Sequence, residues 1–216
     1  MAEIIFEDRD TLVCIKPSGV LSEGEGDNCM PTLLSRLCGS PIFPVHRLDR
    51  ETAGLMVFAK NQASAAALSE HIRKGDMKKQ YLAVVHGVPE KSEDTLDDLL
   101  FFDRARGKSF IVDRPRKGVK QALLDYRVLD SRDSLSLLAV DLHTGRTHQI
   151  RAQLSHRRHP IVGDRRYGAP KSERTGFGLL SRSLSFPHPS TGEQLLFRAE
   201  IPNTYPWDTF ELPEQE

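Results

Sequence analysis

Short apolar runs that follow one another with no helical segment between them most constrain the fold of this chain. Residues 122–129 (ALLDYRVL) and 135–142 (LSLLAVDL) are two such runs, separated only by a short polar stretch. Similar runs, each flanked by Gly, Pro, Asp or Ser, occupy residues 12–16, 55–60, 80–86 and 194–201. This pattern predicts consecutive β-strands that pair with their neighbours.

Helical patterns are fewer. Asn61 is a suitable N-cap for a helix over residues 62–74, which Gly75 ends. A short helix is expected over residues 31–37, and Thr147 can cap a third over residues 148–158. Strands outnumber helices, so the sequence predicts an α+β fold around a mixed, mostly antiparallel sheet, in preference to a doubly wound α/β fold.

Composition limits the classes of function. The chain has 216 residues, of which 38% are hydrophobic and 28% charged, as in a globular protein with a substantial core. Its 30 basic and 30 acidic residues give a formal net charge of zero, so any binding of nucleic acid must rest on local basic patches. No apolar run approaches the ~20 residues of a membrane span, and the N-terminus MAEIIFEDRD lacks a secretory signal pattern. We therefore expect a cytoplasmic protein that does not bind membranes.

Several kinds of catalytic site are not predicted. No phosphate-cradling glycine motif and no GxSxG elbow occur. The cysteines Cys14, Cys29 and Cys38 show no CxxC spacing, which indicates inert thiols in a reducing compartment. Four histidines lie close together at 143, 148, 156 and 159, but arginines crowd the same segment and oppose cation binding. We therefore expect no metal site.

Residues 45–60 (VHRLDRETAGLMVFAK) place a charged cluster directly before a predicted buried strand. His46, Arg47, Asp49 and Arg50 lie within five positions. A strand has no need of these charges, so the carboxylate of Asp49 is a candidate for chemistry. The alternative is a structural role, in which Asp49 only forms a salt bridge with a neighbouring arginine.

Residues 143–169 form a strongly basic segment within a neutral chain. On the predicted helix, His148, Arg151 and Ser155 share one face, while Ile150 and Leu154 lie on a neighbouring one. Arg151 can then point into a cleft, where its planar fork suits carboxylates and phosphates. An ordinary salt-bridged helix surface remains the alternative.

Two further segments are interpreted as polar excursions. Residues 90–98 are acidic, and residues 103–118 (DRARGKSFIVDRPRKG) carry six basic side chains around a short strand at 110–112. A solvated hairpin is the simpler interpretation of the second segment, and an arm that contacts phosphates is the functional one.

Taken together, the blocks HRLDRETAGLMVFAK, KKQYLAVVHG, GRTHQIRAQLSHRRHPIVGDRRYG and LSFPHPSTGE resemble the RluA-like pseudouridine synthases, in order and in spacing. The resemblance begins at EDRDTLVCIKPSGVLSEG and covers nearly the whole chain. It implies a bisected, mostly antiparallel sheet with flanking helices, an RNA-modifying isomerase, and no cofactor. It also implies a single catalytic domain over residues 1–216, with no room for a separate S4-type RNA-binding domain.

The resemblance also assigns roles to individual residues. Asp49 matches the essential catalytic aspartate, Tyr81 the tyrosine that packs against the target base, and Arg151 the basic residue that pairs with the aspartate. Arg47 is similar to the arginine that can enter the RNA as the base leaves its stack. Where many relatives have a histidine before the LSF strand, this chain reads LLSRSLSF, so no role is carried to that position.

The expected partner is a structured RNA, a stem-loop in ribosomal or transfer RNA, because RNA readers favour unstacked loop bases. We expect the protein to be a monomer. The alternative to an enzyme is an inactive RNA-binding module with the same fold, against which the intact Asp49, Tyr81 and Arg151 argue. The residues expected to bind RNA are His46, Arg47, Arg146, His148, Arg157, Arg158, Arg165 and Arg166.

Overall fold

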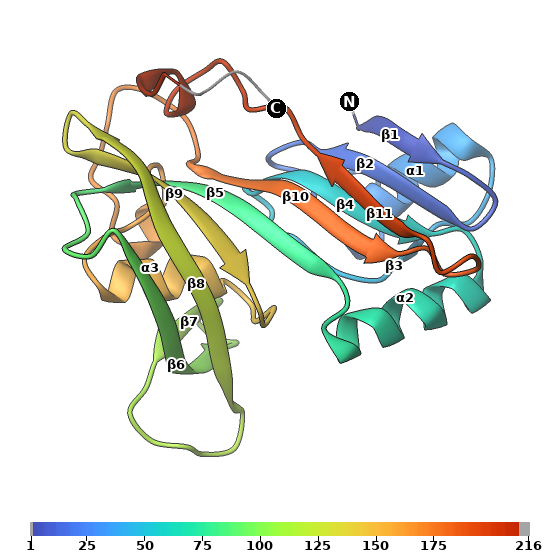
Figure 1. The fold of residues 1–216 in the computed structure, drawn as a ribbon, viewed down its shortest axis with the longest axis horizontal. Helices are drawn as coiled ribbons and strands as arrows, with labels where there is room; N and C mark the ends of the chain where they lie inside the picture. Colours follow the sequence, from blue (N-terminus) through green and yellow to red (C-terminus); the bar gives the residue numbers. More distant parts are fainter. Residues whose placement is uncertain (1, 212–216) are drawn as a thin grey trace. The chain divides into compact units, whose positions relative to one another are not determined.

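The computed structural model describes residues 2–211, and its backbone divides into two compact units (Figure 1). The first unit comprises Met1–Gln80 and Leu180–Glu200, and the second comprises Tyr81–Leu179 and Ile201–Glu216. The chain therefore leaves the first unit after Gln80 and returns to it at Leu180.

The first unit is a sheet with two helices. Its elements are β1 (Glu3–Glu7), β2 (Thr11–Lys16), α1 (Met30–Cys38), β3 (Phe43–Pro44), β4 (Ala53–Ala59), α2 (Gln62–Lys74), β10 (Leu179–Pro187) and β11 (Gln194–Arg198). The strand order is β1-β2-β4-β10, with β11 on β10 and β3 on β4. All of these pairs are antiparallel except that of β4 with β10, which is parallel. The sheet is thus mixed and mostly antiparallel.

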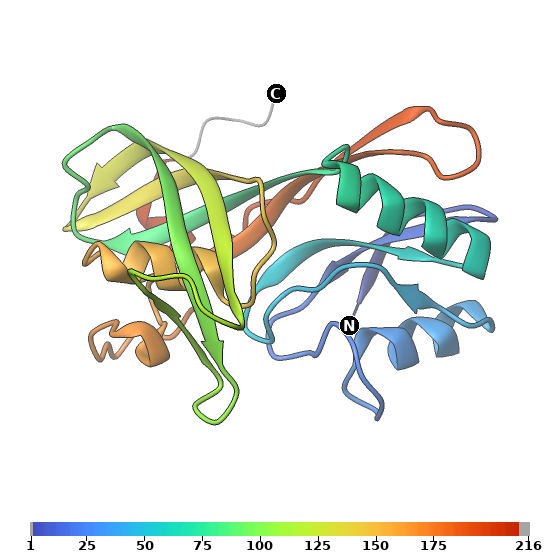
Figure 2. The same cartoon turned by 90° about the horizontal axis from the view of Figure 1, so that it is seen from below.

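The core of this unit forms where α2 packs against β3 and β4 (Figure 2). Leu68 of α2 is fully buried against Val57 of β4 and Phe186 of β10, with Ala65 and Ile72 at the edge of the cluster. These three α2 residues recur at helical spacing and form one apolar face. The Asn61 side chain caps the helix by accepting a hydrogen bond from the Ser64 amide at 2.8 Å.

Among the described residues, the second unit is a sheet with one α-helix. Its elements are β5 (Lys78–His86), β6 (Glu93–Asp103), β7 (Lys108–Ile111), β8 (Val119–Arg132), β9 (Leu135–Leu142), α3 (Gln149–His156) and the 3-10 turns η1 (Arg165–Tyr167) and η2 (Trp207–Thr209). The strand order is β5-β9-β8-β6-β7, and the pairs β6–β7, β6–β8 and β8–β9 are antiparallel. Helix α3 packs against β6, β7 and η1, and its residues from Gln149 to Leu154 are all buried (Figure 2).

The predicted fold class, α+β with a mixed, mostly antiparallel sheet, is confirmed. The predicted strands at 12–16, 55–60, 80–86, 122–129, 135–142 and 194–201 correspond to β2, β4, β5, β8, β9 and β11. The predicted helix over residues 62–74 has the same bounds as α2. Among the described residues, no helix is long and apolar enough to cross a membrane.

Two local predictions are wrong. The acidic segment 90–98 is not an excursion, because β6 begins at Glu93 and buries Leu96 and Leu100 on one side. Thr147 does not cap the third helix: the N-cap is His148, in a left-handed conformation with φ of 54°, and the helix ends at His156. The turn before α3 is held instead by the Gln149 side chain, whose Oε1 accepts from the Arg146 amide and whose Nε2 donates to Leu123 O.

Gly54 allows β4 and β10 to meet in parallel. Its φ is +112°, and it pairs with Ser181 of β10. A Cβ at this position would lie 2.7 Å from Ser181 N and still nearer to its carbonyl oxygen. Only glycine fits, and it follows directly on the HRLDRETA segment, so this contact fixes where that segment enters the sheet.

We expect Gly54→Ala to lower the free energy of unfolding by about 2–4 kcal/mol, because the new methyl group adds backbone strain to a backbone clash. Chemical denaturation measures the change. Gly24→Ala is the matched control, since Gly24 has a φ of +106° and no atom within 4 Å of an added Cβ. Equal losses in the two variants would show that the approach of β10 is not the limiting contact.

Candidate active site

In the first unit, the backbone around Asp49 is held at every carbonyl from Leu48 to Glu51. The Asp49 carbonyl accepts from the Thr52 amide at 3.1 Å, and that of Arg50 accepts from the Gly19 amide at 2.8 Å. Hydroxyl groups reach the other two: Ser22 Oγ donates to Leu48 O and Ser18 Oγ to Glu51 O, at 2.8 and 2.7 Å. The KPSGVLS segment therefore clamps the aspartate loop onto the end of β4.

Lys16 is the centre of this clamp. It is fully buried, and its ammonium donates to the carbonyls of Pro17, Val20 and Arg50 at 2.8, 2.8 and 3.0 Å. Desolvation by burial lowers the pKa of Lys16 to about 8, while the nearby carboxylates of Glu51 and Asp49 oppose the shift. The amine therefore stays mostly protonated at neutral pH and supplies a positive charge close to Asp49.

The residues on either side of Asp49 have structural partners. His46 Nε2 accepts from the Val57 amide at 3.0 Å, and burial, with a smaller effect of Lys79, lowers the pKa of His46 to about 3. The ring is neutral, so its expected RNA binding loses its electrostatic basis. Arg47 is half-exposed and pairs with Glu23 at 2.5 Å, and Arg50 Nε donates to Gly19 O at 3.0 Å.

In the second unit, Tyr81 lies near the beginning of β5 and is 5% exposed. Farther along the same strand, β5 is joined by the segment that follows α3. The Val162 amide donates to Val84 O at 2.9 Å, and the His86 amide donates to Pro160 O at 3.0 Å. One strand thus carries Tyr81 and also fixes the residues that lead to Asp164.

Arg151 forms a buried ion pair with Asp164. Its Nε donates to Oδ2 at 2.6 Å and its Nη2 to Oδ1 at 2.9 Å, and the two side chains are 4% and 1% exposed. The rings of Tyr167 and Phe177 lie 5.1 and 5.4 Å from the guanidinium. The alternative of an ordinary salt-bridged helix surface does not describe Arg151, because its ion pair with Asp164 is buried inside the unit.

The other basic residues of the segment differ in what they contact. Arg146 Nε donates to Gln121 O at 2.9 Å, and His148 Nδ1 lies 3.1 Å from the Tyr167 hydroxyl. Arg165 and Arg166 are exposed, and Arg166 Nη1 donates to Gly107 O at 2.5 Å.

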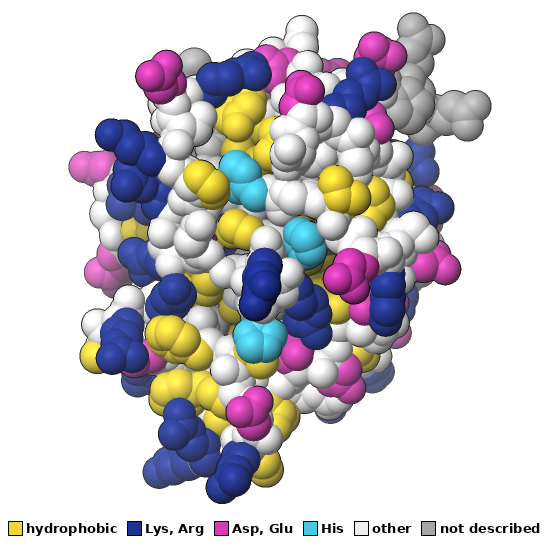
Figure 3. Space-filling view, turned by 90° about the vertical axis from the view of Figure 1, so that its left-hand side faces the viewer, with side chains coloured by type: hydrophobic (Ala, Val, Ile, Leu, Met, Phe, Trp, Pro, Cys, Tyr) yellow, Lys and Arg dark blue, Asp and Glu magenta, His cyan; other side chains and the backbone are white. Residues whose placement is uncertain are grey.

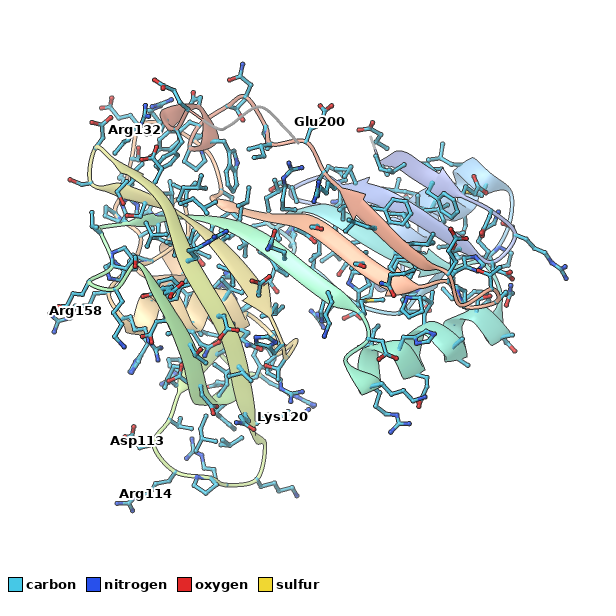
Figure 4. All side chains as sticks on the ribbon, in the orientation of Figure 1. Asp113, Arg114, Lys120, Arg132, Arg158 and Glu200 are labelled. Atoms are coloured by element: carbon cyan, nitrogen blue, oxygen red, sulfur yellow. The ribbon has the colours of Figure 1, made fainter. Side chains whose placement is uncertain are left out.

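The C-terminal end of α3 carries two of the expected RNA ligands. Arg157 forms a two-point pair with Asp98, with distances of 2.9 and 3.2 Å. Arg158 is exposed and has a φ of +66°, a conformation that glycine usually provides at a helix end, and it points outward (Figure 4). Asp98 therefore neutralises Arg157 at this end of the helix.

The basic excursion forms the β6–β7 turn and the β7–β8 loop, and the expected short strand at 110–112 is β7, shifted to begin at Lys108. The exposed cations of this arm are Arg104, Arg106, Arg114, Arg116, Lys117 and Lys120. Arg114 and Asp113 mark the tip of the β7–β8 loop, which projects beyond the strands (Figure 4). Lys and Arg side chains gather at the lower end of the face shown in Figure 3.

Three residues of the site carry no sequence signal that identifies them. Lys16 ends an apolar run, Asp164 lies among arginines, and Tyr167 follows them in GDRRYG. An acid buried next to a basic helix, and a lysine inside a strand, could have prompted a search for partners. However, neither the partners of Lys16 nor the partner of Asp164 lie at a sequence spacing that a local pattern predicts.

The described residues contain no group of three or more His, Cys, Asp or Glu side chains that could hold a metal ion. Of the crowded histidines, His143 pairs with Asp125 at 2.6 Å, and His159 Nδ1 lies 3.1 Å from His86 O.

Comparisons with known proteins agree with this architecture. The family model for RNA pseudouridylate synthase matches residues 10–156. The chain is 32% identical to an uncharacterized RNA pseudouridine synthase of Mycoplasma pneumoniae over 209 residues, covering 94% of this chain and 68% of that protein. It is 31% identical over 223 residues to the tRNA pseudouridine synthase C of Haemophilus ducreyi, covering 91% and 90% of the two chains.

A third relative is the ribosomal large subunit pseudouridine synthase D of Zymomonas mobilis, which is 32% identical over 93% of this chain and 69% of that protein. Among solved structures, the human RNA pseudouridylate synthase domain containing 4 protein superimposes with a TM-score of 0.76 at 28% identity, covering 93% of this chain and 88% of that one. The chain therefore belongs to the RluA-type family of RNA pseudouridine synthases, which are isomerases.

Proposed function

We propose that the protein converts a specific uridine in a structured ribosomal or transfer RNA into pseudouridine, with Asp49 as the reacting carboxylate. The observation that carries this proposal is the clamp on residues 48–51, in which the buried ammonium of Lys16 and two serine hydroxyls hold the aspartate backbone. A loop that merely connects two strands does not need a buried cation to hold it.

The proposed reaction needs no energy source. The N1–C1′ bond of uridine breaks, the base rotates, C5 bonds to C1′, and the hydrogen on C5 leaves while N1 gains one, so atoms and electrons balance. Asp49 either attacks as a nucleophile or stabilises the electron-poor centre. Tyr81 offers a flat face to the base and a hydroxyl that can move a proton. The family resemblance assigns to Arg151 the pairing with the catalytic aspartate, a role that suits its planar guanidinium.

Which class of RNA the protein modifies is part of this proposal. Relatives of this chain are named for ribosomal RNA and for transfer RNA. Flipping a uridine out of its stack costs the least free energy in a loop, because loop bases are already partly unstacked. This favours stem-loops as substrates.

The first test is to compare RNA from cells with and without the gene. Pseudouridine is mapped by carbodiimide labelling and primer extension in total RNA, and purified protein is then added to the RNA of the deletion strain. We expect one or a few sites to disappear in the deletion strain and to return on addition of the protein. An identical pseudouridine map in both strains, with no conversion in vitro, would favour the inactive RNA-binding module.

Asp49→Asn is expected to lower the rate of pseudouridine formation by at least about 10³-fold, because the amide is isosteric but cannot act as a nucleophile or carry charge. RNA affinity should stay within about threefold, because phosphate contacts dominate binding. Asp76→Asn, an exposed carboxylate beyond α2, is the control and should keep the wild-type rate. Turnover by Asp49→Asn near the wild-type rate would exclude Asp49 as the reacting carboxylate.

Lys16→Met should remove the ammonium donor from the carbonyls of Pro17, Val20 and Arg50, of which Arg50 O keeps the Gly19 amide, and should lower the free energy of unfolding by about 2–4 kcal/mol. Among molecules that remain folded, the rate of pseudouridine formation should fall as well, since the Asp49 loop loses its clamp. Thermal melting and single-turnover assays measure the two effects separately. A variant with a lowered melting temperature and an unchanged rate would show that Lys16 serves stability alone.

From the exposed cations of the basic arm we predict how the affinity for RNA depends on salt concentration. Replacing Arg114, Arg116 and Lys117 together by Gln should weaken RNA binding by about tenfold or more at low salt, and should flatten the plot of log K against log salt. Arg36→Gln combined with Lys74→Gln is the control, because both residues are exposed in the first unit and neither is in the arm. Equal effects of the two sets would contradict a role for the arm.

A further inference from the structure

An acidic loop of the first unit, residues 22–27 (SEGEGD), contacts the HRLD segment that carries Asp49. Its acids are Glu23, Glu25 and Asp27, and the loop contains no basic residue. Glu23 Oε1 accepts a hydrogen bond from Arg47 Nη1 at 2.5 Å. Arg47 is one of the residues expected to bind RNA, so in the free protein an acid already occupies an expected RNA ligand.

One hydrogen bond places Glu23 beside Arg47. Ser22 is 3% exposed, and its hydroxyl donates to Leu48 O at 2.8 Å. Glu23 follows Ser22 directly and Arg47 precedes Leu48 directly. The attachment of the loop therefore brings the two charged side chains together, so their contact does not depend on side-chain flexibility alone.

The backbone of the acidic loop is also held at its ends and along its length. The Met30 amide donates to Leu21 O at 2.8 Å and closes the loop. Cys29 is fully buried, and its sulfur lies 3.2 Å from the carbonyl oxygens of Gly24 and Gly26. The acids of the loop are therefore kept close to the HRLD segment.

The ion pair of Glu23 and Arg47 can open without disturbing the fold. The two side chains are 48% and 52% exposed, and within the described residues Arg47 has no second ion pair. Exposed pairs contribute little to stability, because water and salt screen their charges. A phosphate that a bound RNA holds at this point can therefore displace the carboxylate. A phosphate on a mobile strand must in addition be ordered, which costs free energy.

We propose that Glu23 is a specificity-determining residue, which occupies Arg47 until a correctly bound RNA supplies a phosphate in its place. This inference rests on the proposed function, because it assumes that Arg47 contacts the substrate RNA. An RNA that fixes no phosphate here leaves Arg47 paired and is repelled by the acidic loop. Like-charge repulsion of this kind lowers the affinity for wrong partners more than for the right one.

The alternative role for Glu23 is to support Arg47, by holding its guanidinium in the orientation that the reaction needs. The two roles predict opposite results. Removing an acid that screens Arg47 strengthens the binding of non-target RNA. Removing an acid that supports Arg47 weakens binding or slows the reaction.

The first test measures the binding of a fluorescein-labelled oligoadenylate of 12 nucleotides, which contains no uridine. Glu23→Gln should strengthen binding about fivefold at low salt, the most that releasing an exposed ion pair provides. It should also steepen the plot of log K against log salt by about 0.7, because one more phosphate contact forms on a single strand. Asp27→Asn is the matched control, since it removes a charge from the same loop but pairs with Arg36 at 2.5 Å, and it should change the affinity less than twofold.

The second test separates the ion pair from the charge of the loop. In the Arg47→Gln background, Glu23→Gln should change the affinity for oligoadenylate by less than about twofold, because no arginine remains to be released. An effect as large as in the wild-type background would show that the loop acts through its charge alone, and would overturn the role of the pair.

The third test uses the target RNA found by the deletion map. Glu23→Gln should strengthen its binding no more than about twofold, so the ratio of affinities for target and oligoadenylate should fall by at least about twofold. The single-turnover rate with protein in excess should stay within about twofold of wild type. Weaker binding of either RNA, an unchanged affinity ratio or a tenfold lower rate would overturn the proposal. If the wild-type protein forms no pseudouridine, the proposed function fails, while the oligoadenylate measurements still decide whether Glu23 screens Arg47.

Discussion

The ion pair between Arg151 and Asp164 constrains the second unit more than any other contact described above. Removing one partner of such a buried pair typically costs about 3–5 kcal/mol, because the remaining charge cannot reach water. The chain between the two residues must therefore bring a helix and a loop together with ångström accuracy. The hydrogen bonds of residues 160–162 to β5 supply that accuracy, and the left-handed Gly163 makes the last bend possible.

The first unit handles a buried cation in a different way. Lys16 meets three neutral carbonyls rather than a carboxylate, and the acids nearest to it, Glu51 and Asp49, act on it through space. Carbonyl dipoles solvate an ammonium without cancelling its charge, so a positive potential remains near Asp49. In the second unit the pairing of Arg151 with Asp164 cancels the charge and keeps the geometry. The two buried cations therefore have different effects. Lys16 supplies a positive potential and fixes the Asp49 loop, whereas Arg151 supplies a guanidinium in a fixed orientation.

Sequence patterns predicted the structural features that depend on residues close together along the chain. The period of apolar residues located most strands, and Asn61 with Gly75 gave both ends of α2. Strands β1, β3 and β6 were missed, and β10 was noted only as the LSF strand of the family resemblance: β3 has two residues, β1 alternates between exposed and half-buried positions with no fully buried residue, and β6 begins within the acidic segment. The left-handed N-cap at His148 was missed because the turn before it depends on Gln149 reaching Leu123 of β8.

The candidate site was predictable where the family motif is local and not where contacts are distant in sequence. Asp49, Tyr81 and Arg151 come from short blocks, and their roles remain proposals. Asp164 was hidden because it sits beside Arg165 and Arg166 in a segment that looks uniformly basic. Only the fold shows that this acid turns inward while its neighbours turn outward, since Asp164 is buried and the two arginines are exposed.

A chain with zero formal charge can still hold RNA if its acids and bases are sorted in space. Arg47 and Arg157 are partly neutralised by Glu23 and Asp98. Within the part of the chain that the structure describes, Arg114, Lys117 and Lys120 have no acidic side chain within ion-pair distance. Phosphates compete poorly for cations that already have a carboxylate partner, because that partner must first be displaced. The electrostatic part of RNA binding is therefore expected to come from the β7–β8 loop more than from the basic helix, although the helix has the more conspicuous sequence.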